Sequence, residues 1–378
     1  MNNLFEYLKW RKDLSFKADP LNEIDNLILS KLSYLPFDKA ISPHLDDRET
    51  LKTVGKRLLD QLEDDALKKE LVILFEEDKQ LLEVLVDSPR YQDLNVFGFV
   101  NHIDPQVEKQ FCAMTIEIDV GLYYVSYRGT DSSFIGWKED FNMAVQRTIP
   151  AQLDAVRYLN RLMDQLEGEF YLGGHSKGGN LAVYAGVFVE SHHSHRVLKI
   201  FSNDGPGFHS SVIATEKFQK NKHKIRSYIP EGSIVGLLLY HDEPVTVVKS
   251  SVNLLFQHDP FTWLVEGKQF LYAPAISERA NFINTTMKQW VENLDHEHQK
   301  QVINDIFEIF TATNVTNYQQ LTESWFKSAR LAIGKYHQYD KEQKKLILDT
   351  IGILFEIGRK NFRFIPKKLT NHDASESE

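Results

Sequence analysis

The chain has 378 residues and a formal net charge of −9, with 42% hydrophobic and 26% charged residues. This composition is that of an ordinary globular protein, and the negative charge disfavours nucleic-acid binding, which needs a concentrated basic face. The one cysteine, Cys112, excludes an intramolecular disulfide, and its apolar neighbours predict a buried, inert thiol. The sequence shows neither a signal-peptide pattern nor an apolar run long enough to span a membrane, so we expect a cytoplasmic protein.

Four regions are expected along the chain. Residues 1–90 carry apolar residues at three- and four-residue spacing, clearest over 56–86, and predict a helical N-terminal region packed on the core. Residues 91–275 alternate short strand-like runs with helical segments, which predicts an α/β domain with a mainly parallel sheet. Residues 276–366 return to a helical pattern, and 367–378 predict a flexible tail. The helical C-terminal region is a cap, an oligomer interface or a docking module, and the sequence does not choose among these.

The elements of the central region can be placed one by one. β-branched and aromatic runs predict strands over 110–118, 122–129, 170–174, 197–204 and 224–230. Helices are expected over 151–168 and over 177–192, on either side of the third of these strands.

The strongest motif is Gly174-His175-Ser176-Lys177-Gly178, which fits Gly-x-Ser-x-Gly. A strand-like run precedes it and an apolar helical run follows, and this is the setting in which a sharp turn exposes a serine hydroxyl. Small residues on both sides let the turn close, and the helix N-terminus behind it favours developing negative charge. We therefore predict Ser176 as a nucleophile and the backbone N–H of Lys177 as an oxyanion donor.

A second motif lies upstream, in YVSYRGTDSSFIGWKEDF over 124–141. A predicted strand ends at Tyr127, and a glycine-containing turn then presents Thr130. A backbone N–H with an adjacent hydroxyl at such a turn is suited to be the second oxyanion donor. The alternative is a tight turn that only shapes the fold.

Together the two motifs resemble the class 3 lipases, the fungal-type triacylglycerol lipase group, and more closely a bacterial branch that carries a lipase-related domain of unknown function. The resemblance covers about 111–263 and leaves out the helical ends. It implies an α/β-hydrolase fold, Ser176 as nucleophile, and an oxyanion hole formed by Thr130 and the Lys177 amide. It also implies that Trp137 and Asp140 support the oxyanion loop without being catalytic.

A serine nucleophile needs a base, and in α/β-hydrolases the base follows it in the chain. His258 is favoured because it comes last, in a loop with apolar and aromatic neighbours, and the resemblance points to the same residue. His241 is the next candidate. The histidines of the segment SHHSHR, over 191–196, lie at the wrong end of the helix after the nucleophile. A metal cluster is conceivable there, but the favoured reading is a solvated loop, and we predict neither a metal nor a cofactor.

The acid is less well defined. The class 3 pattern places an aspartate where this chain has Ser233, in Pro230-Glu231-Gly232-Ser233-Ile234-Val235. Asp204 is the first replacement, because it ends a strand where functional groups collect in such sheets. Glu231 is the alternative, and Asp242, Asp259 or a dyad without an acid stay open. Lys177 either meets an anionic substrate group or is solvated at the helix edge.

Two classes of function follow from these observations. The favoured one is a serine hydrolase that cleaves small-molecule or lipid esters through an acyl-enzyme on Ser176. The alternative is a catalytically inactive hydrolase-fold protein with an interaction or regulatory role, motivated by Ser233 and the long helical C-terminus. A basic and aromatic segment over 360–368 gives only a weak indication of contact with a membrane surface. The apolar runs over 234–240 and 253–265 either line an acyl pocket or belong to the core.

Overall fold

The structure is a computed structural model that describes residues 2–62, 76–107, 109–130, 143, 146–281 and 284–285. The chain divides into two compact units, Met1–Ile303 and Asn304–Glu378, and all described residues belong to the first. Most of the predicted helical C-terminal region, the whole predicted tail and the segment 360–368 lie outside the described residues. The domain boundaries and the oligomer interface therefore stay predictions.

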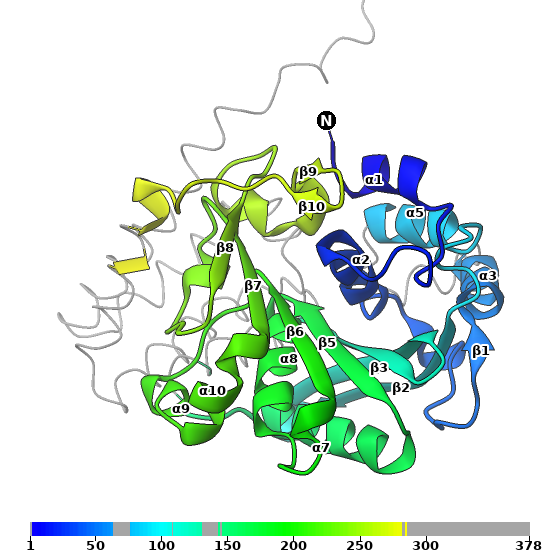
Figure 1. Cartoon of the computed structure of the whole chain (residues 1–378), viewed down its shortest axis with the longest axis horizontal. Coiled ribbons are helices and arrows are strands. Elements are labelled where there is room, and N and C mark those ends of the chain that lie inside the picture. The colour runs from blue at the N-terminus through cyan, green and yellow to red at the C-terminus, as the bar shows by residue number, and fades with distance from the viewer. Residues whose placement is uncertain are drawn as a thin grey trace, which may run out of the picture. The chain divides into compact units, whose positions relative to one another are not determined.

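One eight-stranded sheet organises the first unit, and its strands are ordered as they follow one another in the chain (Figure 1). The first four strands pair antiparallel, and the fourth to the eighth pair parallel. The strands are β1 (Glu49–Thr50), β2 (Asn95–Asp104), β3 (Lys109–Asp119), β4 (Leu122–Tyr127), β5 (Glu169–His175), β6 (Val197–Asn203), β7 (Ile225–Pro230) and β8 (Val245–Val248). A separate hairpin joins β9 (Val265–Glu266) and β10 (Gln269–Phe270).

Helices cover both faces of this sheet (Figure 1). On one face α2 packs against β4 and β5, and on the other α8 packs against β5 and β6. The N-terminal helices are α1 (Leu4–Arg11), α2 (Glu23–Leu32), α3 (Leu51–Leu62) and α5 (Glu76–Leu85). The later ones are α7 (Pro150–Gln165), α8 (Lys177–Phe188), α9 (Ser210–Ile213) and α10 (Glu216–Asn221). A mainly parallel sheet between two helical layers is the α/β-hydrolase architecture, which confirms the predicted fold class.

Every strand and helix predicted in the central region is present, but several of them end earlier than expected. The strand expected over 122–129 ends at Tyr127, and the helix expected over 151–168 ends at Gln165. The helix expected over 177–192 ends at Phe188, because the residues that follow form a turn. Cys112 is buried, as expected, with only 1% of its surface exposed. Among the described helices, none is long and apolar enough to cross a membrane.

A buried polar network fixes α2 to the ends of the central strands. The Asn26 side chain donates to the Asn203 side chain over 2.9 Å, and the Asn203 amide donates in turn to the Gly174 carbonyl over 3.1 Å. The Tyr124 hydroxyl donates to the Asn26 side chain over 2.7 Å. A buried polar group left without a partner costs about 1–3 kcal/mol, so this network holds the ends of β5 and β6 in one register. The proposed nucleophile follows directly after β5.

Candidate functional site

Ser176 lies at a strained turn between β5 and α8. Its backbone angles are φ 57° and ψ −135°, in a region that residues other than glycine rarely occupy. Its N–H donates to the Asn203 carbonyl on the neighbouring strand over 2.9 Å, which ties the turn to the sheet. The strained backbone is the geometry that lifts a serine hydroxyl out of the turn between a strand and a helix.

The glycines of the motif are needed because backbone segments meet there. A Cβ on Gly174 would lie 2.3 Å from the Gly178 carbonyl carbon, and a Cβ on Gly178 would lie 2.1 Å from the Tyr127 carbonyl oxygen. Neither position has room for a side chain. The same packing brings the loop after β4 against the nucleophile, since a Cβ on Gly129 would lie 3.1 Å from the Cβ of Ser176.

A hydrogen-bonded relay runs from Ser176 to a buried carboxylate. His258 Nε2 lies 3.0 Å from Ser176 Oγ, and His258 Nδ1 lies 2.7 Å from Asp204 Oδ2. The side chain of Asp204 is fully buried, whereas that of His258 is 28% exposed. Because a carboxylate only accepts hydrogen bonds, Nδ1 carries the proton, and Nε2 is left as the acceptor for the serine hydroxyl.

Asp204 and Ser233, which the sequence analysis considered at the position of the acid, are bonded to each other. Asp204 follows β6 with a positive φ of 51°, a conformation that aspartate tolerates better than most residues. Ser233, which stands where that pattern has its aspartate, donates its hydroxyl to Asp204 Oδ2 over 2.8 Å. The Ser233 hydroxyl thus holds the same carboxylate oxygen that is bonded to His258.

The other predicted acids point elsewhere. Within the described residues, Asp204 is the one carboxylate hydrogen-bonded to His258. The backbone of Glu231 pairs with Val248, and no hydrogen bond joins its side chain to His258 in this part of the chain. Asp242 forms an ion pair with Lys222 over 2.8 Å, and Asp259 accepts from the backbone N–H of Phe261 over 3.0 Å. Burial also raises the pKa of the Asp259 carboxyl above its ordinary value.

His241, the alternative base, belongs to a separate pair. Its Nδ1 lies 2.7 Å from Glu243 Oε1, and Ser227 donates to the same oxygen over 2.8 Å. Burial raises the pKa of Glu243, but the hydrogen bonds from His241 and Ser227 outweigh this and hold that pKa below its ordinary value. No serine hydroxyl of the described residues is bonded to His241 Nε2. The structure therefore groups His258, and not His241, with the nucleophile.

The two predicted oxyanion donors lie on the two segments that meet at Ser176. Lys177 is the first residue of α8, where backbone N–H groups lie outside the intrahelical pattern, and Thr130 follows Gly129 in the adjoining loop. Trp137 and Asp140, expected to support this loop, lie outside the described residues. The prediction of a solvated Lys177 side chain is wrong, because only 1% of this residue is exposed. Helix α8 is buried on all sides near its start, which leaves that side chain no route to solvent.

His175 is a residue that the sequence analysis did not single out. Its ring stacks against that of His258 with centroids 4.6 Å apart, and its Nε2 lies 2.7 Å from the His258 carbonyl oxygen. Its Nδ1 lies 3.2 Å from the hydroxyl of Tyr34, from the N-terminal helical region. Because the carbonyl only accepts, Nε2 carries a proton. The Gly-x-Ser-x-Gly pattern leaves this position open, so the motif alone held no signal for it.

Electrostatics keep the His175 ring neutral. Burial, followed by the nearby His258 and Lys31, lowers its pKa well below the ordinary value. Lys31 forms a buried ion pair with Asp78 over 3.0 Å and lies over the ring of Tyr34 at 4.1 Å from its centroid. The N-terminal helices thus supply a positive charge near His175, and protonation of this residue is disfavoured.

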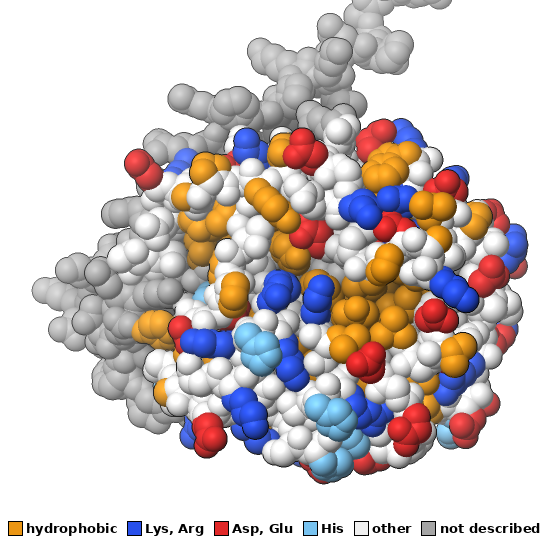
Figure 2. Space-filling model, in the orientation of Figure 1, with side chains coloured by type: hydrophobic (Ala, Val, Ile, Leu, Met, Phe, Trp, Pro, Cys, Tyr) orange, Lys and Arg blue, Asp and Glu red, His pale blue; other side chains and the backbone are white. Residues whose placement is uncertain are grey.

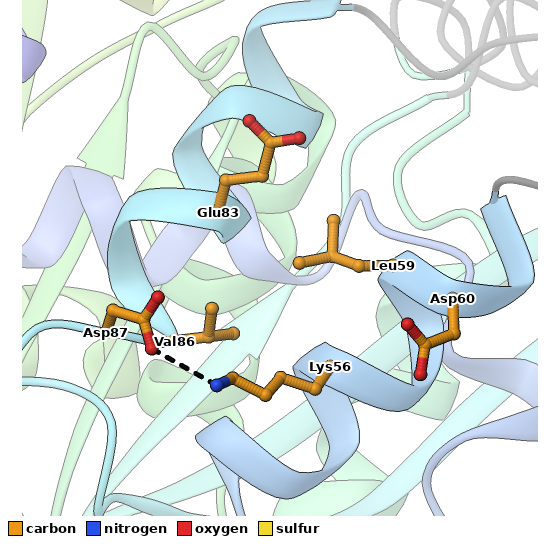
Figure 3. Close-up of a pocket in the computed structure, with 6 residues that line it drawn as sticks. All are labelled: Lys56, Leu59, Asp60, Glu83, Val86 and Asp87. Carbon is orange, nitrogen blue, oxygen red and sulfur yellow. Dashed lines mark ion pairs between the residues drawn. The ribbon is translucent and has the colours of Figure 1, made fainter.

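A surface hollow between α3 and α5 is separate from this site (Figure 3). It has a volume of about 340 Å³ and is lined by Lys56, Leu59, Asp60, Glu83, Val86 and Asp87. Lys56 pairs with Asp87 over 3.3 Å, and both side chains are more than half exposed. None of the relay residues lines it, and its mixed charges do not suit an acyl chain.

The sheet, the strained serine turn and the relay define a lipase-like α/β-hydrolase fold with a serine–histidine–aspartate arrangement. The chain belongs to the Mbeg1-like family, whose model matches residues 85–308.

Solved structures, lipases among them, are similar to it at low identity. A mutant form of MDLA from Penicillium cyclopium is 10% identical, with 67% of this chain and 86% of that chain covered and a TM-score of 0.40. The M37 lipase is 15% identical, with 56% and 68% covered and a TM-score of 0.34. The Rhizomucor miehei lipase in its propeptide complex is 12% identical, with 58% and 79% covered and a TM-score of 0.33. A search of curated proteins gave no match.

Proposed function

We propose that this protein is a serine hydrolase that cleaves carboxylic esters through an acyl-enzyme on Ser176. The observation that carries the proposal is the unbroken relay from Ser176 Oγ through His258 to the buried Asp204. A serine hydroxyl is a weak nucleophile by itself, and a hydrogen-bonded base oriented by a carboxylate is the arrangement that activates it.

The reaction follows from the placement of the protons. His258 Nε2 takes the hydroxyl proton while Ser176 Oγ bonds to the ester carbonyl carbon, and Asp204 stabilises the imidazolium that forms. The carbonyl oxygen becomes an oxyanion, for which we assign the Lys177 amide and Thr130 as donors, helped by the N-terminus of α8. His258 then returns the proton to the leaving alcohol. Water repeats the sequence on the acyl-enzyme and releases the acid and the free serine.

His175 acts in this scheme as a positioning residue. Its hydrogen bond to the His258 carbonyl and its ring stack hold the backbone and the face of the catalytic imidazole. Because its own pKa is lowered well below the ordinary value, it adds no charge that would oppose protonation of His258 during the reaction.

An acyl chain is the substrate feature that the surroundings favour. The apolar run after Ser233 forms a short 3-10 helix, Val235–Leu237, beside the acid, and its Val235 and Leu237 are only partly buried. Phe256, two residues before His258, is 50% exposed. Partly exposed apolar side chains in the segments that supply Ser233 and His258 support an ester with an apolar acyl group, in line with the resemblance to class 3 lipases.

The test compares wild type with Ser176→Ala, with Ser251→Ala as a control for an exposed serine outside the relay. Labelling by a fluorophosphonate probe and turnover of p-nitrophenyl esters from acetate to laurate are measured on all three proteins. We expect wild type and the control to label and turn over, with longer acyl chains preferred, and Ser176→Ala to do neither. Equal labelling and turnover in wild type and Ser176→Ala would contradict the proposal. Background values in both proteins would favour an inactive scaffold with a binding role, and equal values above background would place the nucleophile elsewhere.

A further inference from the structure

The C-terminal end of α8 carries a second cluster of ionisable side chains. Asp164 lies in the last turn of α7, and His192 and His193 follow α8 in the turn that leads to β6. One ligand atom from each of these residues lies within 4.8 Å of the other two. In Figure 2, histidine side chains gather at the lower edge of the visible face, near the position of α7 in Figure 1.

The sequence-based reading of this turn as a solvated loop is wrong for one of its histidines. The side chain of His193 is 8% exposed, and its Nε2 lies 2.8 Å from Asp164 Oδ1. The ring of His192 lies beside it with centroids 3.9 Å apart, and its Nδ1 is 3.7 Å from Glu190 Oε2. Two imidazoles and the Asp164 carboxylate therefore gather at one point of the surface, with Glu190 beside His192.

The spacing of these atoms suits a small divalent cation. Zinc is bound at about 2.0–2.2 Å by imidazole nitrogen and carboxylate oxygen, so neighbouring ligand atoms of a tetrahedral site lie about 3.3 Å apart. The ligand atoms of His193 and Asp164 are 2.8 Å apart, and no two ligand atoms of the set are more than 4.8 Å apart, so small side-chain movements bring them to that spacing. The side chains of His192 and Asp164 are 64% and 60% exposed, so each can rotate to close the set around an ion.

The backbone that presents the cluster is already held in place. The Asn160 side chain of α7 accepts from the backbone N–H of Glu190 over 3.0 Å, and the N–H of His193 donates to the Glu190 carbonyl over 2.9 Å. Arg196 binds α7 from the other side, donating to the Met163 carbonyl over 2.7 Å. Ordering the turn therefore adds little to the cost of binding an ion.

The charges around the cluster favour a cation. The C-terminal ends of α7 and α8 are both near it, and neither helix has a basic residue in its last turn. A helix C-terminus carries a partial negative charge, which Asp164 and Glu190 increase. Three cations lie near this turn, and each donates to backbone carbonyls. The Arg196 guanidinium donates to the carbonyls of 163, 166 and 168, Lys217 to the Val189 carbonyl over 3.5 Å and Lys224 to the Ser194 carbonyl over 2.6 Å. Among the described residues, none of them forms an ion pair with Asp164.

We propose that Asp164, His192 and His193 bind a divalent transition-metal ion, with Zn²⁺ as the best match and Glu190 or water as the fourth ligand. Mixed imidazole and carboxylate donors suit this ion better than Mg²⁺ or Ca²⁺, which prefer oxygen alone. The ion clamps the turn after α8 onto α7. Ser176 precedes the other end of the same twelve-residue helix, about 18 Å away at 1.5 Å per residue, so the metal takes no part in hydrolysis.

The test is a Zn²⁺ titration of the full chain by calorimetry, together with its thermal unfolding, and a chelator reverses the effect. We expect one ion per chain and a raised Tm. His192→Ala should weaken binding at least ten-fold, because an exposed ligand is lost without disturbing the fold. Asp164→Asn tests the carboxylate in the same way. His195→Ala, in the same turn and exposed but outside the cluster, is the matched control and should bind as wild type does.

Two outcomes would overturn the proposal. One is binding by His192→Ala and Asp164→Asn that equals wild type, which would place any bound ion elsewhere. The other is an equal loss in His195→Ala, which would mark non-specific binding to surface histidines. Ester turnover is measured on the same variants and should be unchanged in all of them, so failure here is distinct from failure of the proposed hydrolase function.

Discussion

A histidine bonded to an aspartate lies near each end of helix α8. In one pair the aspartate is the buried partner, and in the other pair the histidine is. Beside the N-terminus, Asp204 is fully buried and His258 is 28% exposed. Beyond the C-terminus, Asp164 is 60% exposed and His193 only 8%. A buried carboxylate fixes the imidazole by its charge and leaves the far nitrogen for a reactant. An exposed carboxylate stays hydrated and is able to turn toward a cation.

A second difference is the group that lies next to the other nitrogen of each imidazole. His258 presents its second nitrogen to the Ser176 hydroxyl at 3.0 Å, so a proton can move along the chain of groups. The neighbours of His193 are a second imidazole and the Asp164 carboxylate, which are groups that bind metals and not nucleophiles. The same residue pair is thus proposed as part of a proton relay at one end and of a cation site at the other.

The largest expected effect is a difference in kcat between variants of His258 and of His241. His258→Ala should lower kcat on a p-nitrophenyl ester by up to about 10⁶-fold, as removal of the base does in serine hydrolases. His241→Ala removes the other carboxylate-bonded histidine considered as a base and should leave kcat within a few-fold of wild type. Steady-state kinetics below the Tm of both variants measures this. A comparable loss in both would mean that the relay has been assigned to the wrong histidine.

The next effect concerns the acid. Asp204→Asn keeps the size of the side chain but removes the charge and the preference for the reactive tautomer of His258, and kcat should fall by about 10⁴-fold. Glu231→Gln, at the alternative position, should change kcat by less than a few-fold. Kinetics together with near-UV circular dichroism separates chemistry from misfolding. A loss in Glu231→Gln alone would transfer the role of the acid to that residue.

The same residues show which parts of the fold and of the candidate site could be predicted from the sequence. Ser176 was predictable because its turn depends on local residues: small neighbours, a strand before and an apolar helix after. Strands with continuous apolar runs were predictable for the same reason. β2 was not recognised, since a glycine with φ +63°, Gly98, and a register shift interrupt its pattern.

The remainder of the site depends on contacts between distant segments. Asp204 and His258 are 54 positions apart and meet only because β6 and the loop after β8 end at one edge of the sheet. The support of Asp204 by Ser233, and of His258 by His175 and Tyr34, depends on the same tertiary packing. No spacing rule in the sequence encodes these contacts, and several acids therefore stayed open.

A smaller effect tests the support of the relay. His175→Phe keeps the ring stack on His258 but removes the hydrogen bond to its carbonyl, and a lost buried bond of about 1–3 kcal/mol predicts a fall in kcat on the order of ten-fold. KM should change little, because the substrate is not contacted. His175→Gln restores a donor without the aromatic ring, so recovery of kcat in this variant would assign the effect to the hydrogen bond. Wild-type kcat in both variants would contradict a positioning role.

His175→Phe should also change how the free energy of unfolding depends on pH. The folded protein keeps His175 neutral because its pKa is lowered, whereas in the unfolded chain this residue binds a proton as the pH falls through about 6.5. The unfolded state then binds more protons, so wild type loses stability below that pH by up to about 1.4 kcal/mol per pH unit. In His175→Phe this contribution is absent. Urea unfolding between pH 5 and pH 8 should therefore show a shallower acid loss, and equal slopes would contradict the burial of a neutral imidazole.

The smallest effect lies at Ser233. Ser233→Ala removes one of the two hydrogen bonds to Asp204 Oδ2, and the net value of such a bond, about 0.5–1.5 kcal/mol, predicts a two- to ten-fold fall in kcat. Ser227→Ala is the matched control, since it removes an equivalent bond of 2.8 Å from the carboxylate bonded to His241. It should cost similar stability without lowering kcat. If both variants lower kcat equally, the serine acts through general stability, whereas a fall in Ser233→Ala alone shows that this hydroxyl takes over part of the task of the aspartate it replaces.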